Sequence, residues 1–159
     1  MISIIAALDK NYLIGFNNHL PWHIKEDLHH FRKLTYGHPV VMGKNTWMSL
    51  GKPLEGRTNI ILTHDKDFHI DGCITLNSIS ELDNIFREEE IFVIGGANIF
   101  RQFLAIADRM YLTRIDYAFS GDTYFPDIDW QQWKLISFEQ LTSEQGYKLA
   151  FEQWERQTR

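Results

Sequence analysis

Residues 91–98 read Ile-Phe-Val-Ile-Gly-Gly-Ala-Asn, and this stretch decides the fold. Four consecutive apolar residues are typical of a strand that is buried on both faces, as in a parallel sheet. Gly95 and Gly96 end the apolar run, and a pattern with helical spacing follows from residue 98 to residue 106. A strand that leads directly into a helix is the repeating unit of α/β domains, so the stretch predicts that class.

The same strand–glycine–helix pattern occurs at residues 39–50, and short β-branched runs alternate with helical patterns along the rest of the chain. We therefore expect one α/β domain over residues 1–159, with a mostly parallel eight-stranded central sheet, an antiparallel C-terminal strand and helices on both faces. We expect residues 9–23 and 116–129 to be loops. The expected strands are residues 2–8, 39–42, 58–62, 74–76, 91–94, 110–115, 134–141 and 148–155, and the expected helices are residues 24–35, 44–50, 78–87 (capped by Ser78, with Glu81 three residues later) and 98–106.

The composition is typical of a globular protein, since 44% of the 159 residues are hydrophobic and 23% are charged. The formal net charge of -5 provides no general attraction to nucleic acid or to anionic membranes. The first residues lack the basic region of a secretory signal, and no run approaches the ~20 apolar residues that span a membrane. A single cysteine, Cys73, cannot form an intramolecular disulfide. We therefore expect a cytoplasmic protein, a monomer by default, that binds neither nucleic acid nor membranes.

Asp27 is the most informative single residue. On the expected helix 24–35 the apolar stripe is formed by Ile24, Leu28, Phe31 and Leu34, and Asp27 lies inside that stripe. One interpretation is that an acid in the first turn favours the helix N-terminus electrostatically. The other is that an acid in an apolar cleft has a raised pKa through desolvation, which suits proton transfer or pairing with a buried cationic ligand.

Two glycine-bearing junctions between a strand and a helix indicate phosphate binding. Residues 41–46 contain Gly43, Lys44 and Thr46, and residues 93–98 contain Gly95 and Gly96. Helix N-termini present free N–H groups to anions, and glycine allows a ligand to approach the backbone. Two such junctions suggest a ligand with two separated phosphate groups. The usual dinucleotide fingerprint and the Walker A motif are both absent from the sequence.

Other chemistries find less support in the sequence. Pro21 stands between His19 and His23, which argues against a two-histidine zinc site on a helix, and we expect no metal site. No nucleophile elbow of the serine hydrolases is present. The basic residues Arg32, Lys52 and Arg57 are either a solvated surface or a site for a carboxylate, for which Arg57 is well placed after a loop stiffened by proline and glycine.

Six short strings are informative together: residues 20–22 (LPW), Asp27 with Phe31, residues 42–47 (MGKNTW), residues 51–54 (GKPL) before Arg57, residues 93–96 (VIGG) and residues 121–126 (GDTYFP). In these strings, which occur in that family's order, the chain resembles bacterial dihydrofolate reductase. The resemblance implies an oxidoreductase that reduces 7,8-dihydrofolate to 5,6,7,8-tetrahydrofolate with NADPH, with a hydride added at C6 and a proton at N5, and that binds antifolate inhibitors. Another pterin or pyrimidine reductase of the same fold, or a nucleotide-binding module without catalysis, stays an alternative.

The resemblance assigns Asp27, Trp22 and Thr113 to catalysis. Asp27 would bind the 2-amino group and N3 of the pterin and promote protonation of N5, Thr113 would hydrogen-bond to Asp27, and Trp22 would hold a water beside it. Arg57 would bind the glutamate α-carboxylate of the substrate. The implied substrate-binding residues are Ile5, Asp27, Leu28, Phe31, Arg32, Leu50, Lys52, Leu54, Arg57, Ile94 and Thr113.

For the cofactor, the resemblance implies a mobile lid at residues 9–23, a loop at Gly121 and Asp122 that supports it, and a cis bond between Gly95 and Gly96. Phe100 stands where many members have Tyr, and Lys44 where Arg is more usual. The implied cofactor-binding residues are Ala7, Ile14, Gly15, Gly43, Lys44, Asn45, Thr46, Leu62, Thr63, His64, Gly95, Gly96, Ala97, Asn98, Ile99 and Phe100.

Overall fold

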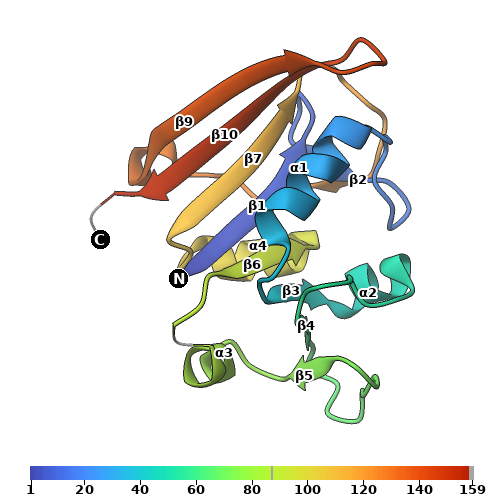
Figure 1. The fold of residues 1–159 in the computed structure, drawn as a ribbon, viewed down its shortest axis with the longest axis vertical. Coiled ribbons are helices and arrows are strands. Elements are labelled where there is room, and N and C mark those ends of the chain that lie inside the picture. The colour runs from blue at the N-terminus through green and yellow to red at the C-terminus, as the bar shows by residue number, and fades with distance from the viewer. Residues whose placement is uncertain (87, 158–159) are drawn as a thin grey trace.

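The computed structural model describes residues 1–86 and 88–157, and eight strands of this part form one sheet in the order β5-β4-β3-β6-β1-β7-β10-β9 (Figure 1). Neighbouring strands from β5 to β7 are parallel, β10 is antiparallel to β7, and β9 is antiparallel to β10. Only β10 therefore runs against the others, and the expected sheet is confirmed. The strands are β1 (Ile2–Leu8), β3 (Val40–Gly43), β4 (Asn59–Leu62), β5 (Ile74–Leu76), β6 (Ile91–Gly95), β7 (Arg109–Ile115), β9 (Trp133–Thr142) and β10 (Lys148–Arg156).

Helices cover both faces of the sheet. Successive residues of a strand point to opposite faces, so neighbouring residues of β1 show which helix packs on each face. Ile4 packs with the α4 residues Ile99 and Phe103 on one face, whereas Ile5 packs with the α2 residue Trp47 on the other. Helix α1 lies over the second face and α3 over the first. The helices are α1 (Lys25–Thr35), α2 (Lys44–Leu50), α3 (Ser80–Ile85) and α4 (Ala97–Leu104), with one 3-10 turn at Trp130–Gln132.

Two expectations about local structure are wrong. The helix expected at 78–87 begins at Ser80, and Ser78 does not cap it, because the Ser78 hydroxyl donates to the Glu81 carboxylate instead. Arg87, the expected last residue, lies outside the described residues. The loops expected at 9–23 and 116–129 contain two short strands, β2 (Leu13–Gly15) and β8 (Thr123–Tyr124), which pair antiparallel. Strands of two or three residues are too short for a hydrophobic alternation to reveal them.

Residues 9–23, here called the lid, and residues 116–129, the brace, are joined beyond this pairing. The Asp122 N–H donates to the Gly15 carbonyl at 3.0 Å, and the Asn17 N–H donates to the Asp122 carboxylate at 3.1 Å. Gly121 permits this approach, since a Cβ there would lie 2.5 Å from the Gly15 carbonyl oxygen. The lid is therefore held in place by its contacts with the brace.

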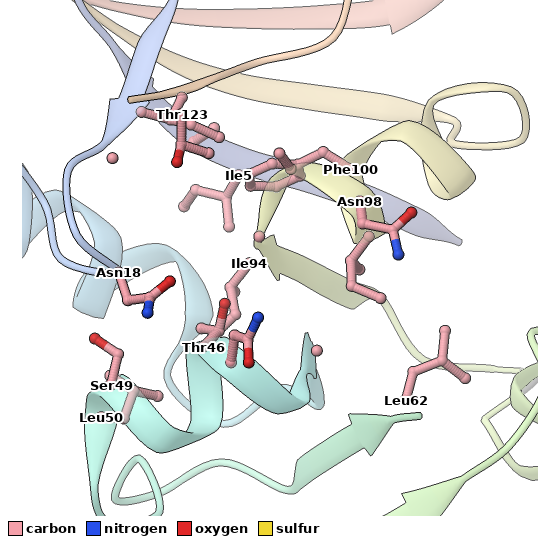
Figure 2. A pocket seen from close by; sticks show the side chains of 18 of the residues that line it. Ile5, Asn18, Thr46, Ser49, Leu50, Leu62, Ile94, Asn98, Phe100 and Thr123 are labelled. Carbon is pink, nitrogen blue, oxygen red and sulfur yellow. The ribbon is translucent and has the colours of Figure 1, made fainter. Parts of the chain in front are cut away.

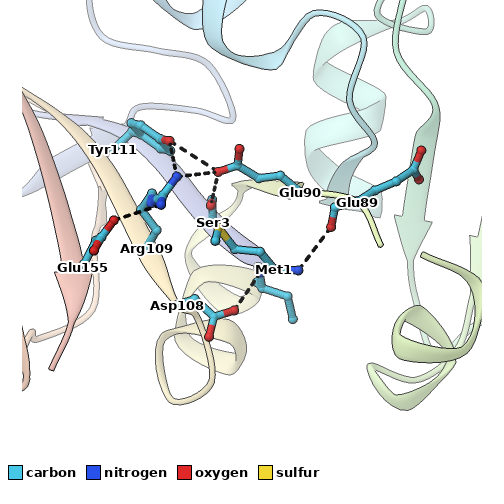
Figure 3. Close-up of polar contacts among 9 residues, drawn as sticks. Met1, Ser3, Glu89, Glu90, Asp108, Arg109, Tyr111 and Glu155 are labelled. Carbon is cyan, nitrogen blue, oxygen red and sulfur yellow. Dashed lines mark hydrogen bonds and ion pairs between the residues drawn. The ribbon is translucent and has the colours of Figure 1, made fainter. Parts of the chain in front are cut away.

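The amino ends of the central strands are joined by a polar network on the edge of the sheet that carries the start of the chain (Figure 3). The Arg109 guanidinium donates to Glu155 at 2.9 Å, to the Tyr111 hydroxyl at 3.0 Å and to Glu90 at 3.5 Å. The hydroxyl of Ser3, which is fully buried on β1, donates to Glu90 at 2.6 Å. This network links β1, β7, β10 and the residue that precedes β6 at one edge of the sheet.

No helix in the described residues is long and apolar enough to cross a membrane.

Candidate active site

A cavity of about 900 Å³ opens where the parallel strands β1, β3, β4 and β6 reach their carboxyl ends. This is the edge at which open α/β sheets bind ligands. Figure 2 shows Ser49 and Leu50 of α2 facing Asn18 of the lid, with Asn98 and Phe100 of α4 further along the cavity. Residues of the lid, α1, α2 and α4 thus line one continuous cavity.

Most of the residues expected from the sequence line this cavity. They come from seven different segments, which the fold brings together although they are far apart in the chain. The expected residues that line it are Ile5, Ala7, Ile14, Gly15, Asp27, Leu28, Phe31, Gly43, Lys44, Asn45, Thr46, Leu50, Leu54, Leu62, Thr63, His64, Ile94, Gly96, Ala97, Asn98, Ile99, Phe100 and Thr113. The expected residues that lie outside its lining are Trp22, Arg32, Lys52, Arg57 and Gly95.

Several lining residues were not expected from the sequence. His30 follows Asp27 by three residues, so helical spacing alone could have identified it; its ring stacks on Phe151 at 3.9 Å, and burial lowers its pKa. The remainder belong to segments whose position depends on tertiary structure. They are Ala6, Asn18, His19, Leu20, Ser49, Asn77, Ser78, Ile79, Gln102 and Thr123.

Asp27 lies in the first turn of α1, and its residue is only 8% exposed. Burial raises the pKa of its carboxyl from 3.8 to about 6, and a hydrogen bond with the Thr113 side chain opposes part of that rise. Two members of the apolar stripe around Asp27, Leu28 and Phe31, line the cavity, whereas Ile24 is buried and Leu34 packs against the core. Asp27 is thus an acid on a cavity wall, which the interpretation as a simple helix-end charge does not explain.

Trp22 lies at the end of the lid, and its ring packs on Phe119 with 5.1 Å between ring centres. The residue is buried, and no acceptor among the described residues pairs with its indole Nε1. A buried N–H without a protein partner is rare and marks a place where a further acceptor is accommodated.

Arg57 is held beside α1 by its own loop. The side chain of Asn59, which is 2% exposed, bonds to the backbone of both Leu54 and Arg57. The Arg57 guanidinium donates to the Thr35 hydroxyl at 3.1 Å and lies 6.0 Å from the centre of the Phe31 ring. Burial, and then the charge of Arg32, lower the pKa of Arg57. A guanidinium fixed in this way is a suitable partner for a carboxylate.

The opposite end of the cavity contains the features expected for phosphate binding. The N-cap residues of helices α2 and α4 are both glycines, Gly43 and Gly96, which line the cavity, and no side chain caps either helix, so the backbone N–H groups at these ends are available to a ligand. The Gly95–Gly96 peptide bond is cis, as expected. Lys44 forms an ion pair with Asp65 at 3.4 Å, beside Thr63 and His64. The donors at this end therefore fit a phosphorylated dinucleotide.

Among the described residues, no group of three or more His, Cys, Asp or Glu side chains is arranged to hold a metal ion.

The fold and site define the class of protein: an α/β enzyme that binds a phosphorylated cofactor next to a second ligand facing one buried acid. The family model for dihydrofolate reductase matches residues 1–156. The chain therefore belongs to the dihydrofolate reductase family.

Relatives and solved structures support the same assignment. The chain is 44% identical over 153 residues to the dihydrofolate reductase of Bacillus subtilis, covering 96% of this chain and 91% of that one. It is 41% identical over 152 residues to that of Haemophilus influenzae, covering 95% and 90%. The structure of Enterococcus faecalis dihydrofolate reductase complexed with NADP(H) and RAB-propyl superposes with a TM-score of 0.94 at 31% identity, covering 99% of this chain and 97% of that one.

Proposed function

We propose that the α1 side of the cavity binds 7,8-dihydrofolate and the α2–α4 side binds NADPH, so that this chain catalyses NADPH-dependent reduction to 5,6,7,8-tetrahydrofolate. The observation that carries the proposal is Asp27, a buried acid with a pKa of about 6 on the wall of a cavity that also holds two uncapped helix N-termini. NADPH, when bound, supplies the hydride that is added at C6.

On the substrate side, the Asp27 carboxylate is proposed to bind the 2-amino group and N3 of the pterin. Its pKa near neutrality allows it to exist in both protonation states at working pH, which suits the delivery of a proton toward N5. Thr113 orients the carboxyl through its hydrogen bond. The free indole N–H of Trp22 is proposed to hold a water on the path of that proton.

The rest of the substrate is proposed to extend from Asp27 toward Arg57. Leu28, Phe31, Leu50 and Leu54 line the cavity between these two points and provide apolar walls for the pterin and benzoyl rings. Arg57 lies just outside the lining, where a ligand that reaches the cavity mouth would present its glutamate carboxylate. Arg32 and Lys52 are proposed to add positive charge there, and Ile5 and Ile94 to offer backbone carbonyls at the pterin edge.

On the cofactor side, the N-termini of α2 and α4 are proposed to bind the phosphates. Ala7, Ile14 and Gly15 would contact the nicotinamide below the lid, and Lys44, Thr63 and His64 the adenosine 2′-phosphate. The remaining proposed contacts are Gly43, Asn45, Thr46, Leu62, Gly95, Ala97, Asn98, Ile99 and Phe100, all but Gly95 on the cavity wall.

The test is the oxidation of NADPH with and without dihydrofolate, with NADH in parallel. We expect turnover that depends on dihydrofolate and favours NADPH. Protein that binds the cofactor but shows no such turnover would point to a related reductase or to a binding module.

Lys44→Ala is expected to weaken NADPH binding about tenfold or more, because a charged hydrogen bond contributes about 1.5–3 kcal/mol. NADH lacks the 2′-phosphate, so its affinity should change little. The measurement is KM for both cofactors in Lys44→Ala and in Lys66→Ala, an exposed lysine next to the same Asp65. Equal losses for NADPH and NADH would remove Lys44 from 2′-phosphate recognition.

Asp27→Asn is expected to stabilise the protein above pH 6. Wild-type protein favours protonated Asp27 when folded, so its free energy of unfolding falls as pH rises from about 4 to about 6. The difference between 3.8 and about 6 corresponds to about 3 kcal/mol, a cost that asparagine does not carry. Urea unfolding between pH 4 and pH 8 measures it, with the exposed Asp71→Asn as the control. Parallel curves for wild type and Asp27→Asn would contradict the raised pKa.

We also propose a monomeric enzyme in the cytoplasm. A single domain of 159 residues makes a monomer the default. The single free cysteine, Cys73, suits a reducing compartment. Sedimentation of the purified protein tests the first statement, and fractionation of cells tests the second.

A further inference from the structure

Asp9 is a buried carboxylate that the steps above do not use. It follows β1, lies outside the cavity lining and is only 1% exposed. One carboxylate oxygen, Oδ1, accepts the backbone N–H groups of Asn11 at 2.8 Å and Leu13 at 2.9 Å. The other, Oδ2, accepts the N–H of Phe119 at 2.9 Å. Such bonds to backbone donors offset the cost of burying a charged group.

The two oxygens of Asp9 serve two different segments. Oδ1 holds the turn that leads into β2 in the lid, and Oδ2 holds the brace four residues before β8. The Lys10 N–H adds a second link, to the Tyr117 carbonyl at 3.1 Å. Since Asp122 joins the lid and brace at the other end of β2, the two segments are tied on both sides of their strand pair.

Phe119 links the hydrogen bonds of Asp9 to the end of the cavity that is proposed to bind the substrate. Its ring contacts Trp22 at 5.1 Å, and both belong to a cluster with Ala7 and Phe151. Ala7 and Phe151 are the neighbours of Thr113 on the adjacent strands β1 and β10. Contacts therefore run from Asp9 through Phe119 and Trp22 to the residues that flank Thr113, the hydrogen-bond partner of Asp27.

We propose that Asp9 is a positioning residue of the reductase, which fixes Phe119 and, through the Phe119 ring, fixes Trp22 next to the proton-delivering side of the site. The inference rests on the proposed function. Asp9 lies outside the cavity, so it acts on the rate of turnover and leaves the affinity for dihydrofolate almost unchanged.

Two variants cut the contact path at different points. In Asp9→Asn the amide oxygen can keep the bonds to Asn11 and Leu13, while its NH2 group faces the Phe119 N–H and opposes that donor. Phe119→Leu leaves every bond to Asp9 in place and removes the ring that contacts Trp22, together with its contacts with Tyr117 and Tyr147. Asp108→Asn is the matched control, because Asp108 also accepts a backbone N–H, from Ile2 at 2.9 Å, on the opposite edge of the sheet.

Both variants are expected to lower kcat about tenfold, since small displacements in a site have effects of this size or larger. We expect KM for dihydrofolate to stay within about threefold and the NMR resonance of the Trp22 indole N–H to shift in both. The double variant should be no slower than the slower single variant, because the two changes break one path. Asp108→Asn should leave kcat and the resonance unchanged.

Wild-type kcat in Asp9→Asn, with only the stability lowered, overturns the proposal, and so does a slow Asp9→Asn beside a normal Phe119→Leu. If Asp9→Asn does not fold, wild-type kcat and an unshifted Trp22 resonance in Phe119→Leu still overturn the proposal, because the proposed path runs through the Phe119 ring. Failure of the proposed function is recognised separately, by wild-type protein that does not oxidise NADPH with dihydrofolate. In that case the Trp22 resonance still reports whether Asp9 fixes Trp22.

Discussion

The Asp27→Asn enzyme is expected to reduce dihydrofolate about 10² to 10⁴ times more slowly than wild type at pH 7, the usual range for the loss of an acid–base group. Among the described residues, Asp27 is the only carboxyl on the cavity wall, so no neighbour can replace it. An amide neither ionises nor releases a proton. Steady-state kinetics with saturating NADPH measures the effect.

The pH profile provides the sharper comparison. Wild-type kcat/KM should fall as pH rises above about 6, because the protonated form of Asp27 is lost. This break should be absent from Asp27→Asn. Thr113→Val is the matched variant: it removes the hydrogen bond that lowers the pKa of Asp27, so its break should move to higher pH. An Asp27→Asn enzyme within tenfold of wild type, with the same break, would remove Asp27 from the mechanism.

Arg57→Ala is expected to weaken folate binding by about 10- to 100-fold, the equivalent of about 1.5–3 kcal/mol for charged hydrogen bonds. A protonated diaminopyrimidine antifolate without a glutamate tail is expected to pair with Asp27 instead, so its affinity should stay the same. Fluorescence titration with both kinds of ligand gives the comparison.

Arg57→Lys separates charge from geometry at the same position. Lysine keeps the positive charge but lacks the planar fork, so folate binding should be intermediate. The thermal unfolding of both variants shows whether the loss of the bond to Thr35 matters for stability. Equal weakening of folate and diaminopyrimidine would show that Arg57 supports the pocket as a whole.

Local patterns were sufficient to predict most of the sheet from the sequence. The apolar run at 91–94 identifies β6 because a strand covered on both faces needs no polar alternation. The strands β2 and β8 could not be found in this way, since their pairing depends on contacts between residues about 110 positions apart. The predicted helix cap at Ser78 is wrong, because the spacing of Ser78 and Glu81 does not reveal that the Ser78 hydroxyl donates to the Glu81 carboxylate.

The candidate site shows the same difference between residues that a local pattern identifies and residues that depend on tertiary contacts. Asp27 was identified because its position on an apolar stripe is a property of one helix, and His30 could have been found by the same spacing. Asn18, Ser49 and Thr123 line the cavity only because the lid, α2 and β8 meet there. The spacing of residues within one helix or strand does not indicate which elements come into contact in the fold. The orientation of the Arg57 side chain toward Thr35 likewise depends on the fold.

The reversal of β10 also determines how the molecule would respond to mechanical load. Because β10 runs opposite to β1 and β7, Met1 and Gln157 lie at the same edge of the sheet and line one small hollow. A force that pulls these two residues apart acts across the strands rather than along them. It would peel the hydrogen bonds between β7 and β10 one after another, beginning at the edge that carries the Arg109 network.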